Sequence, residues 1–318
     1  MNEKELYYPY SKYLKMRYGE KVYKLPVNLP VSCPNRITGK GCSFCAEAGT
    51  GFEAMNSAIS VTEQLLHTRE YIEKRYHAHK FIAYFQNYTN TFMPLEDFRS
   101  YMQEAAKVPD IVEISVSTRP DCIREDYLDV LDEIRETTDI QITIELGLQT
   151  VNYHTLKAIS RGHSLAEFID AVLRISRYSF DICTHVILNL PGDCKDDSIE
   201  TAKILSSLPI QIVKAHSLYI AKNTQLCEAY ENGTITLCAK EEYLERLMLF
   251  LEYLRPDIAV ERLFSRIPEK DAVFCNWNTS WWKLKDELFE KMSSAHSFQG
   301  KCFNYLDGAA LHILEHKE

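Results

Sequence analysis

The stretch CPNRITGKGCSFC, residues 33–45, places three thiols close together in the chain, at Cys33, Cys42 and Cys45. Two residues separate Cys42 from Cys45, so one tight turn can direct both sulfurs at a single metal centre. Cys33 has to be brought back by a loop, and Gly39 and Gly41 give that loop the freedom to bend. The spacing therefore predicts that the three thiols share one site.

Four interpretations of this site compete. A disulfide is disfavoured because the number of thiols is odd and no export signal is recognisable. A structural zinc ion needs a fourth ligand, yet the next Cys or His after Cys45 is His67. Inert, buried thiols would be poorly placed in a polar, glycine-rich loop. A cluster of four irons and four sulfides (4Fe-4S) held by three thiolates would leave one iron free to bind a substrate or cofactor.

The arrangement resembles the cluster motif of the radical S-adenosylmethionine (radical SAM) enzymes. The gap of eight residues after Cys33 is wider than the usual gap of three. It is similar to the gap in the branch that contains the catalytic subunit of Elongator and, more closely, the bacterial proteins of the YhcC and YtqA (MnmL) type. The resemblance extends over most of the chain, from about residue 20 to 225, through the stretches KLPVNLPVSCPN, AYFQNYTNTF, STRPDC, ELGLQT, SRGHS and VILNLPGD.

The resemblance implies both cofactors and a reaction. Cys33, Cys42 and Cys45 would hold a 4Fe-4S cluster whose open iron binds S-adenosylmethionine. Reductive cleavage would then give a 5′-deoxyadenosyl radical that takes hydrogen from the substrate. The branch suggests tRNA as partner, with conversion of a wobble-uridine carboxymethylaminomethyl group to aminomethyl. A reducing donor such as flavodoxin or ferredoxin would supply the electron.

The same resemblance implies a set of cofactor contacts at strand ends. The backbone of the first three residues of the set would receive the methionine amino group. Ser117 and His185 would face the ribose. Gln149 and Arg161 would contact the ribose and the carboxylate. The final pair would cradle adenine through backbone groups. The set is Gln86, Asn87, Tyr88, Ser117, Gln149, Arg161, His185, Asn189 and Leu190.

Three further titratable residues each allow two interpretations. His216 follows the last strand of the repeat and is the candidate catalytic acid or base. His163 comes just before the helix-capping Ser164, which favours a structural hydrogen bond over acid–base chemistry. Glu145 lies within an apolar run, so it is either a paired buried charge or a ligand facing the barrel interior.

Strand and helix patterns alternate along residues 21–226, which indicates an α/β fold with parallel strands. The alternation alone fits a doubly wound sheet as well. The resemblance favours a partial (β/α)6 TIM-like barrel, with residues 1–20 as an N-terminal helix and residues 227–318 as an α/β extension packed on the barrel. The six expected strands cover about residues 21–28, 81–85, 111–116, 140–146, 182–188 and 210–219.

Composition limits the alternatives for function. Hydrophobic residues make up 46% and charged residues 25% of the 318 residues, as in a soluble globule, and no signal peptide or membrane span is recognisable, so we expect a cytoplasmic protein without a membrane partner. The net charge of −9 disfavours broad contact with nucleic acid. This mildly favours the alternative of a radical enzyme acting on a small metabolite. A noncatalytic, metal-stapled module that binds RNA or protein is a further alternative.

Two groups of side chains could still contact RNA. Basic residues between 12 and 24 alternate with tyrosines, which suits phosphate contacts, although a solvated helix face is the favoured interpretation. The three tryptophans, Trp277, Trp281 and Trp282, are expected to anchor a C-terminal helix, with stacking on a flipped base as the alternative.

Overall fold

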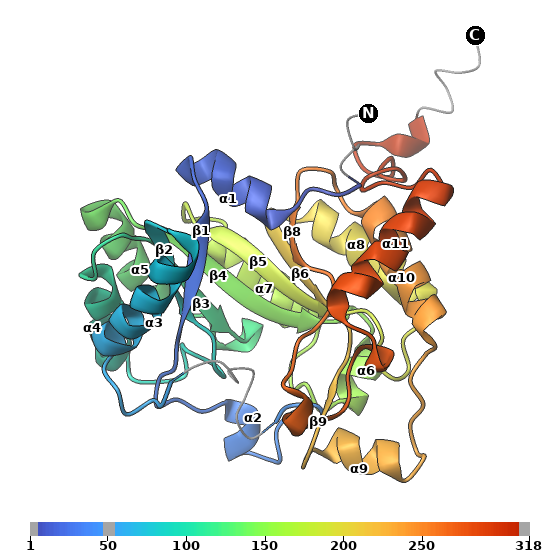
Figure 1. Cartoon of the computed structure of the whole chain (residues 1–318), viewed down its shortest axis with the longest axis horizontal. Helices are drawn as coiled ribbons and strands as arrows, with labels where there is room; N and C mark the ends of the chain where they lie inside the picture. Colours follow the sequence, from blue (N-terminus) through green and yellow to red (C-terminus); the bar gives the residue numbers. More distant parts are fainter. Residues whose placement is uncertain (1–5, 47–54, 312–318) are drawn as a thin grey trace.

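The computed structural model describes residues 6–46 and 55–311, and its centre is one parallel β-sheet (Figure 1). Within the described residues the sheet has seven strands, in the order β1-β2-β3-β4-β5-β6-β8. All neighbours in this order pair in parallel. The strands are β1 Val22–Val27, β2 Lys80–Phe85, β3 Ile111–Thr118, β4 Gln141–Gln149, β5 Asp181–Ile187, β6 Ile212–His216 and β8 Ala259–Arg262.

Helices connect the strands because two parallel strands cannot be joined by a tight turn. Ser60 with Glu63 and Ser164 with Glu167 have the Ser-x-x-Glu pattern of a capping box, and both pairs form one in the structure, at the starts of α3 and α7. Figure 1 shows α3, α4 and α5 on one flank of the sheet and α8 and α10 on the other. The connecting helices are α3 Val61–Tyr76, α4 Leu95–Ala106, α5 Glu125–Thr138, α6 Tyr153–Ala158, α7 Leu165–Ile175, α8 Lys195–Ser207 and α10 Lys240–Tyr253.

The α/β barrel class expected from the sequence is confirmed, with one difference in the strand count. Six strands were expected, and the described sheet contains a seventh, β8, which pairs in parallel with β6. This strand lies in the segment expected to form the C-terminal extension. That segment therefore contributes an edge strand to the sheet as well as helices.

The sheet curls into a partial barrel whose edge strands are β1 and β8. Helix α1 (Tyr10–Tyr18) contacts both edges, and Pro9 forms a parallel bridge with Val260. In Figure 1 this helix lies at the end of the sheet opposite to the short helix α2 (Pro34–Ile37). Tyr10 and Leu14 are buried against the inner face of the sheet. Helix α1 thus covers the end of the barrel away from the cysteine loop.

Two cations of the basic N-terminal segment, Arg17 and Lys24, turn towards the barrel. The expectation of a solvated face is wrong for these two residues. Arg17 is ion-paired with Asp181, the first residue of β5. Tyr18 Oη donates a hydrogen bond of 2.6 Å to Glu113. Lys24 projects from β1 into the barrel, where its Nζ meets two carboxylates. These contacts hold α1 against the amino ends of the strands.

The chain after β6 packs on the barrel through α10, which contacts α8. Trp277 is anchored as expected, since its Nε1 donates to Cys238 O at 2.9 Å and its ring lies 5.2 Å from that of Tyr243. Trp281 and Trp282 differ, with exposed fractions of 39% and 58%. The remaining elements are β7 Ile220–Ala221 and β9 Ala272–Phe274, which pair antiparallel, and helices α9 Gln225–Glu231 and α11 Trp281–Ser294.

Among the described residues, no helix combines the length and the apolar character that crossing a membrane would require.

Candidate active site

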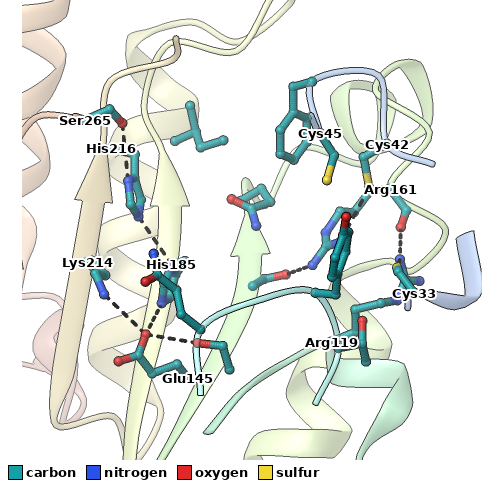
Figure 2. Close-up of a pocket in the computed structure, with 18 of the residues that line it drawn as sticks. Cys33, Cys42, Cys45, Arg119, Glu145, Arg161, His185, Lys214, His216 and Ser265 are labelled. Atoms are coloured by element: carbon teal, nitrogen blue, oxygen red, sulfur yellow. Dashed lines mark hydrogen bonds and ion pairs between the residues drawn. The ribbon is translucent and has the colours of Figure 1, made fainter. Parts of the chain in front are cut away.

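The carboxyl ends of the strands and the cysteine loop together line one pocket (Figure 2). The placement follows from the parallel sheet, because the carboxyl ends of all its strands meet at one end of the barrel. The expected site residues that line this pocket are Cys33, Cys42, Cys45, Gln86, Tyr88, Ser117, Gln149, Arg161, His185 and His216.

Asn35 fixes the cysteine loop to the turn between α6 and α7. Its Nδ2 lies 2.9 Å from Ser160 O, 2.8 Å from Arg161 O and 3.4 Å from Cys42 Sγ. This close approach requires glycine at position 162, where φ is +80° and a Cβ would lie 2.3 Å from Asn35 Oδ1. Gly162, in the SRGHS stretch, therefore lets the loop dock.

Each thiol in the pocket has an arginine beside it. A neighbouring cation favours the thiolate form of cysteine, which is the form that binds metals. Arginine itself stays protonated and is no metal ligand. The distances from a guanidinium nitrogen to the sulfur are 3.9 Å for Arg119 and Cys33, 3.6 Å for Arg161 and Cys42, and 3.7 Å for Arg36 and Cys45.

The set of donors fits a cluster better than a single zinc ion. A structural zinc ion is held by four protein ligands. The cysteine loop supplies three thiols, and all three line the pocket. In an iron-sulfur cluster each cysteine thiolate binds a different iron, so three thiolates can hold it. The donor set of three thiols therefore fits the cluster.

Two of the arginines carry buried nitrogen donors that no other described residue satisfies. Arg36 Nε and Arg161 Nε have no hydrogen-bond partner among the described residues. Buried donors are normally paired, so an anionic ligand group in the pocket would complete their hydrogen bonding. Burial raises the pKa of Cys45, although the hydrogen bond from Arg36 opposes this. Metal binding would hold that sulfur as a thiolate.

Two residues at strand ends have left-handed backbone conformations, which cost non-glycine residues roughly 1–3 kcal/mol and cluster at binding sites. They are Tyr88, with φ of +53°, and Gln149, with φ of +78°. The register between β4 and β5 shifts between Gly147 and Gln149. Both side chains line the pocket, so the irregular backbone directs them towards the space beside the thiols.

Three of the expected cofactor residues do not line the pocket. Asn87 is buried, and its Nδ2 donates to Asn28 Oδ1 at 2.6 Å. Asn189 Oδ1 accepts a hydrogen bond of 2.6 Å from Leu218 N, and Leu190 is buried in an apolar cluster. The side chains of these residues therefore support the walls of the pocket.

His185 lines the pocket, but both of its ring nitrogens are already engaged. Nε2 lies 2.6 Å from Glu145 Oε2, and Nδ1 lies 3.3 Å from His216 Nε2. The ribose contact expected from the resemblance would have to displace one of these partners. Figure 2 shows the two histidines on the wall of the pocket facing the cysteines.

Four charged side chains, two of them buried (Glu145 and Lys214) and two partly buried (Lys24 and Glu261), form a closed ring below the histidines. Lys24 Nζ is 2.7 Å from both Glu145 and Glu261, and Lys214 Nζ is 3.0 Å from Glu261 and 3.4 Å from Glu145. Of the two interpretations of Glu145, the paired buried charge is thus confirmed. The ring joins β1 to β8 across the gap between the edges of the sheet.

The ring keeps its carboxylates ionised. Burial alone would raise the pKa of Glu145, but Lys214 and Lys24 outweigh it and hold that pKa well below its usual range. The ligand atoms of Glu145, Cys183 and His185 lie within 4.8 Å of one another, close enough for a metal ion. Because two ammonium groups already neutralise this carboxylate, a metal cation would have to compete with them.

Sequence reasoning missed several residues of the site. Arg36 and Arg119 stand beside thiols, and the STRPDC stretch was the only sequence signal for Arg119. Lys214 lies within an apolar strand as Glu145 does, and this shared position could have identified the pair. Ser265 follows β8, which was not expected to join the sheet, so no sequence signal placed it here.

Asp193, at the end of the VILNLPGD stretch, predicts a pH-dependent effect on stability. Burial raises the pKa of Asp193 to about 6, and its buried Oδ1 has no hydrogen-bond partner among the described residues. Because the folded pKa exceeds the unfolded value, its contribution to stability is present below about pH 4 and is lost as the pH rises through 6. We therefore expect Asp193→Asn to stabilise the metal-free chain at pH 8 by roughly 1–2 kcal/mol and to change little at pH 4.

Urea unfolding of wild type and variant at both pH values checks this expectation. An equal effect at the two pH values would show that ionisation of Asp193 is not its cause.

The chain matches two adjoining domains of known proteins. Residues 27–205 match the Radical SAM superfamily, and residues 210–294 match the Radical SAM C-terminal domain. Bacillus subtilis YtqA is 31% identical over 309 residues, which cover 96% of this chain and 95% of that protein. The chain belongs to the radical SAM superfamily. This radical SAM enzyme is also 31% identical to Escherichia coli YhcC, over 90% of its own length and 92% of that protein.

More distant relatives of this radical SAM enzyme modify tRNA. A tRNA uridine(34) acetyltransferase of Methanocaldococcus infernus is 22% identical over 52% of this chain and 32% of that protein. The solved structure of Elp3 from the same organism has a TM-score of 0.66 with 17% identity, covering 87% of this chain and 64% of that one. This similarity confirms the fold. Radical SAM enzymes use a 4Fe-4S cluster and S-adenosylmethionine.

Proposed function

We propose that this radical SAM enzyme holds a 4Fe-4S cluster through Cys33, Cys42 and Cys45 and acts on tRNA, converting a wobble-uridine carboxymethylaminomethyl group to aminomethyl. The observation that carries the proposal is the placement of three thiols, each beside an arginine, in a pocket at the carboxyl ends of the strands. When bound, the cluster and S-adenosylmethionine supply a 5′-deoxyadenosyl radical that takes hydrogen from the substrate. The protein orients the reactants and excludes water.

The wall next to the thiols offers groups suited to S-adenosylmethionine. Arg161 spans from Cys42 to Gly147 O, to which its Nη2 donates at 2.7 Å, and its buried Nε is available to a carboxylate. Gln149 lines the same wall and can hydrogen-bond the ribose. Gln86, Tyr88 and Ser117 line the neighbouring strand ends, where the amino group and the ribose would lie.

Gly147→Ala is expected to weaken binding of S-adenosylmethionine. The added methyl would lie 2.6 Å from Arg161 Nη2 and 2.8 Å from Gln149 Nε2, so both side chains must move. Both contacts involve flexible side-chain ends, so the fold should tolerate the change. Displaced supporting groups typically cost ten- to a hundredfold in affinity, and we expect a loss of about this size. Equilibrium binding to the anaerobically reconstituted chain measures it.

Gly39→Ala is the matched control in the cysteine loop, because its methyl would meet only Asn35 O, at an ordinary 3.5 Å. Equal affinities of the Gly147 variant and the wild type would remove Arg161 and Gln149 from the proposed cofactor site.

Two observations support tRNA as the substrate. The relatives include the tRNA uridine(34) acetyltransferase described above. Arg266 lines the pocket and lies over the Trp281 ring, with 4.0 Å from Cζ to the ring centroid, and Trp282 is 58% exposed beside it. Exposed aromatic rings and arginines are the groups on which unpaired bases stack.

The test of the proposed function has two stages. Anaerobic reconstitution with iron, sulfide and dithionite should give a chain that forms 5′-deoxyadenosine from S-adenosylmethionine. Incubation with tRNA that carries carboxymethylaminomethyluridine should then give aminomethyluridine, detected by mass spectrometry of the nucleosides. Formation of 5′-deoxyadenosine without any change in this nucleoside would leave the radical chemistry intact and refute the tRNA substrate.

A small metabolite is the second candidate substrate, favoured by the net charge of −9. Filter binding of tRNA at increasing salt separates the two candidates. Phosphate contacts make tRNA affinity fall steeply with salt, whereas an enzyme for a small metabolite should retain no tRNA at any salt concentration.

A further inference from the structure

Four side chains on the wall opposite the thiols are linked by a continuous series of hydrogen bonds (Figure 2). Ser265 Oγ lies 3.3 Å from His216 Nδ1, and His216 Nε2 lies 3.3 Å from His185 Nδ1. His185 Nε2 lies 2.6 Å from Glu145 Oε2. The two imidazole rings lie at an interplanar angle of 24°, with their centroids 5.3 Å apart. This series of hydrogen bonds leads from the pocket to the charged ring inside the barrel.

All hydrogen bonds of this series are donated in one direction, from Ser265 towards Glu145. The ionised Glu145 can only accept, so the proton of a neutral His185 must be on Nε2. Its bare Nδ1 then accepts from His216 Nε2, and the bare Nδ1 of His216 accepts from the Ser265 hydroxyl. Every hydrogen-bonding proton of the series thus points towards Glu145.

Burial keeps both rings neutral at rest. Burial lowers the pKa of His216 well below its usual range, and repulsion from the neighbouring His185, Arg262 and Lys214 adds to this effect. Burial also lowers the pKa of His185, against the hydrogen bond to Glu145. The titratable and charged groups that face the two rings within the described residues include Glu145, Lys214, Glu261, Arg262 and the Cys183 thiol.

We propose that Ser265, His216, His185 and Glu145 form a proton relay that accepts a proton from a protonated amine of the substrate. The substrate proton passes to Ser265 Oγ while the serine proton moves to His216 Nδ1. The proton on His216 Nε2 then moves to His185 Nδ1. Ser265 and His216 end neutral, and His185 becomes an imidazolium held by the Glu145 carboxylate. No electrons are transferred in this step.

The relay rests on the proposed function for the identity of its amine. A carboxymethylaminomethyl group contains a secondary amine, and alkyl amines are mostly protonated at neutral pH. Loss of that proton exposes a nitrogen lone pair beside the carbon from which hydrogen is taken, and an adjacent lone pair stabilises a carbon radical. A base on the wall facing the thiols is therefore useful to this reaction.

The protonation states and tautomers of the two histidines are tested without any substrate. The full chain, with its oxidised cluster and with 15N-labelled histidine, is examined by long-range 1H–15N NMR between pH 6.5 and 8. His216→Gln and His185→Gln assign the two rings among the ten histidines. Both rings should be neutral with the proton on Nε2. A charged ring, or a proton on Nδ1 of either ring, overturns the relay.

The use of the relay is tested with His216→Gln, because glutamine can still donate to His185 and accept from Ser265 but cannot take up a proton. We expect aminomethyluridine formation at pH 7 to fall by about a hundredfold, the usual contribution of a general base. The deprotonated fraction of an amine rises about tenfold per pH unit below its pKa, so the defect should shrink greatly by pH 9. A structural role would give the same defect at both pH values and overturns the relay, as does a wild-type rate at pH 7.

Two further variants complete the test. Ser265→Ala should show the same pH-dependent defect, to a smaller extent. His163→Gln is the matched control. Among the described residues, its ring nitrogens are within hydrogen-bond distance of two carbonyl oxygens, Gly147 O at 3.1 Å and Ser164 O at 3.2 Å, so any loss should not vary with pH. If the wild type leaves tRNA unmodified while NMR shows both rings neutral with the proton on Nε2, the proposed function is wrong. The relay would then serve a different amine substrate.

Discussion

A Cys42→Ala chain is expected to lose its cluster and with it the cleavage of S-adenosylmethionine. Cys42 is 7% exposed, and its sulfur receives contacts from Asn35 at 3.4 Å and Arg161 at 3.6 Å. Without this thiolate, two ligands would remain for a cluster that needs three. Because loss of a group behind a metal ligand already costs about 10- to 100-fold, loss of the ligand itself should lower 5′-deoxyadenosine formation by more than about a hundredfold.

Iron and sulfide per chain, measured after anaerobic reconstitution, check the loss independently of activity. Cys122→Ala is the matched control, because this half-buried thiol near Arg119 lies outside the three-cysteine motif. The control should keep the cluster content of the wild type. A Cys42→Ala chain with a full complement of iron and sulfide would require different ligands, and so would a Cys122→Ala chain without them.

The sequence predicts best those features that depend on neighbours in the chain. The capping box at Ser60 and the start of α4 at Leu95, directly after Pro94, can be recognised in the sequence because a few adjacent residues determine helix starts. Alternation of strands and helices indicates a parallel sheet, and a parallel sheet brings strand ends to one edge. That logic placed Gln149 and His216 beside one pocket.

Features that depend on contacts between distant segments could not be predicted in this way. Lys24 and Glu261 are ion-paired although 237 positions separate them in the chain. Neither residue has a local pattern that names its partner, and the pairing exists only because β8 joins the sheet. The arginines beside the thiols are of the same kind, since Arg119 reaches Cys33 across 86 positions.

Glu145→Ala is expected to destabilise the chain by about 3–5 kcal/mol, the usual cost of removing one partner from a buried ion pair. Glu145 is 1% exposed, and the substitution leaves Lys24 and Lys214 with Glu261 as the one remaining carboxylate of the ring. Tyr84 and His185 lose a hydrogen-bond partner as well. Urea unfolding of the metal-free chain at pH 7 measures the change.

The effect should depend on pH in a defined direction. The folded pKa of Glu145 lies well below its unfolded value, so its contribution is fully present above about pH 4.3 and is lost as the pH falls through the folded pKa. Glu133→Ala is the control for an ordinary ion pair, because Glu133 is 56% exposed where it pairs with Arg99. Exposed pairs contribute about 0–1 kcal/mol, so a similar cost for both variants would show that the buried ring does not stabilise the fold.

A double variant distinguishes charge balance from the loss of individual contacts. Glu145→Gln with Lys214→Met removes one anion and one cation, so Lys24 and Glu261 remain as a neutral pair at 2.7 Å. Because each single variant leaves one unmatched charge in the barrel, we expect the double variant to cost less than the sum of the two single ones. Additive costs would mean that the four groups act as separate contacts. Sub-additive costs would show that Glu145 on β4 and Lys214 on β6 act within one electrostatic unit.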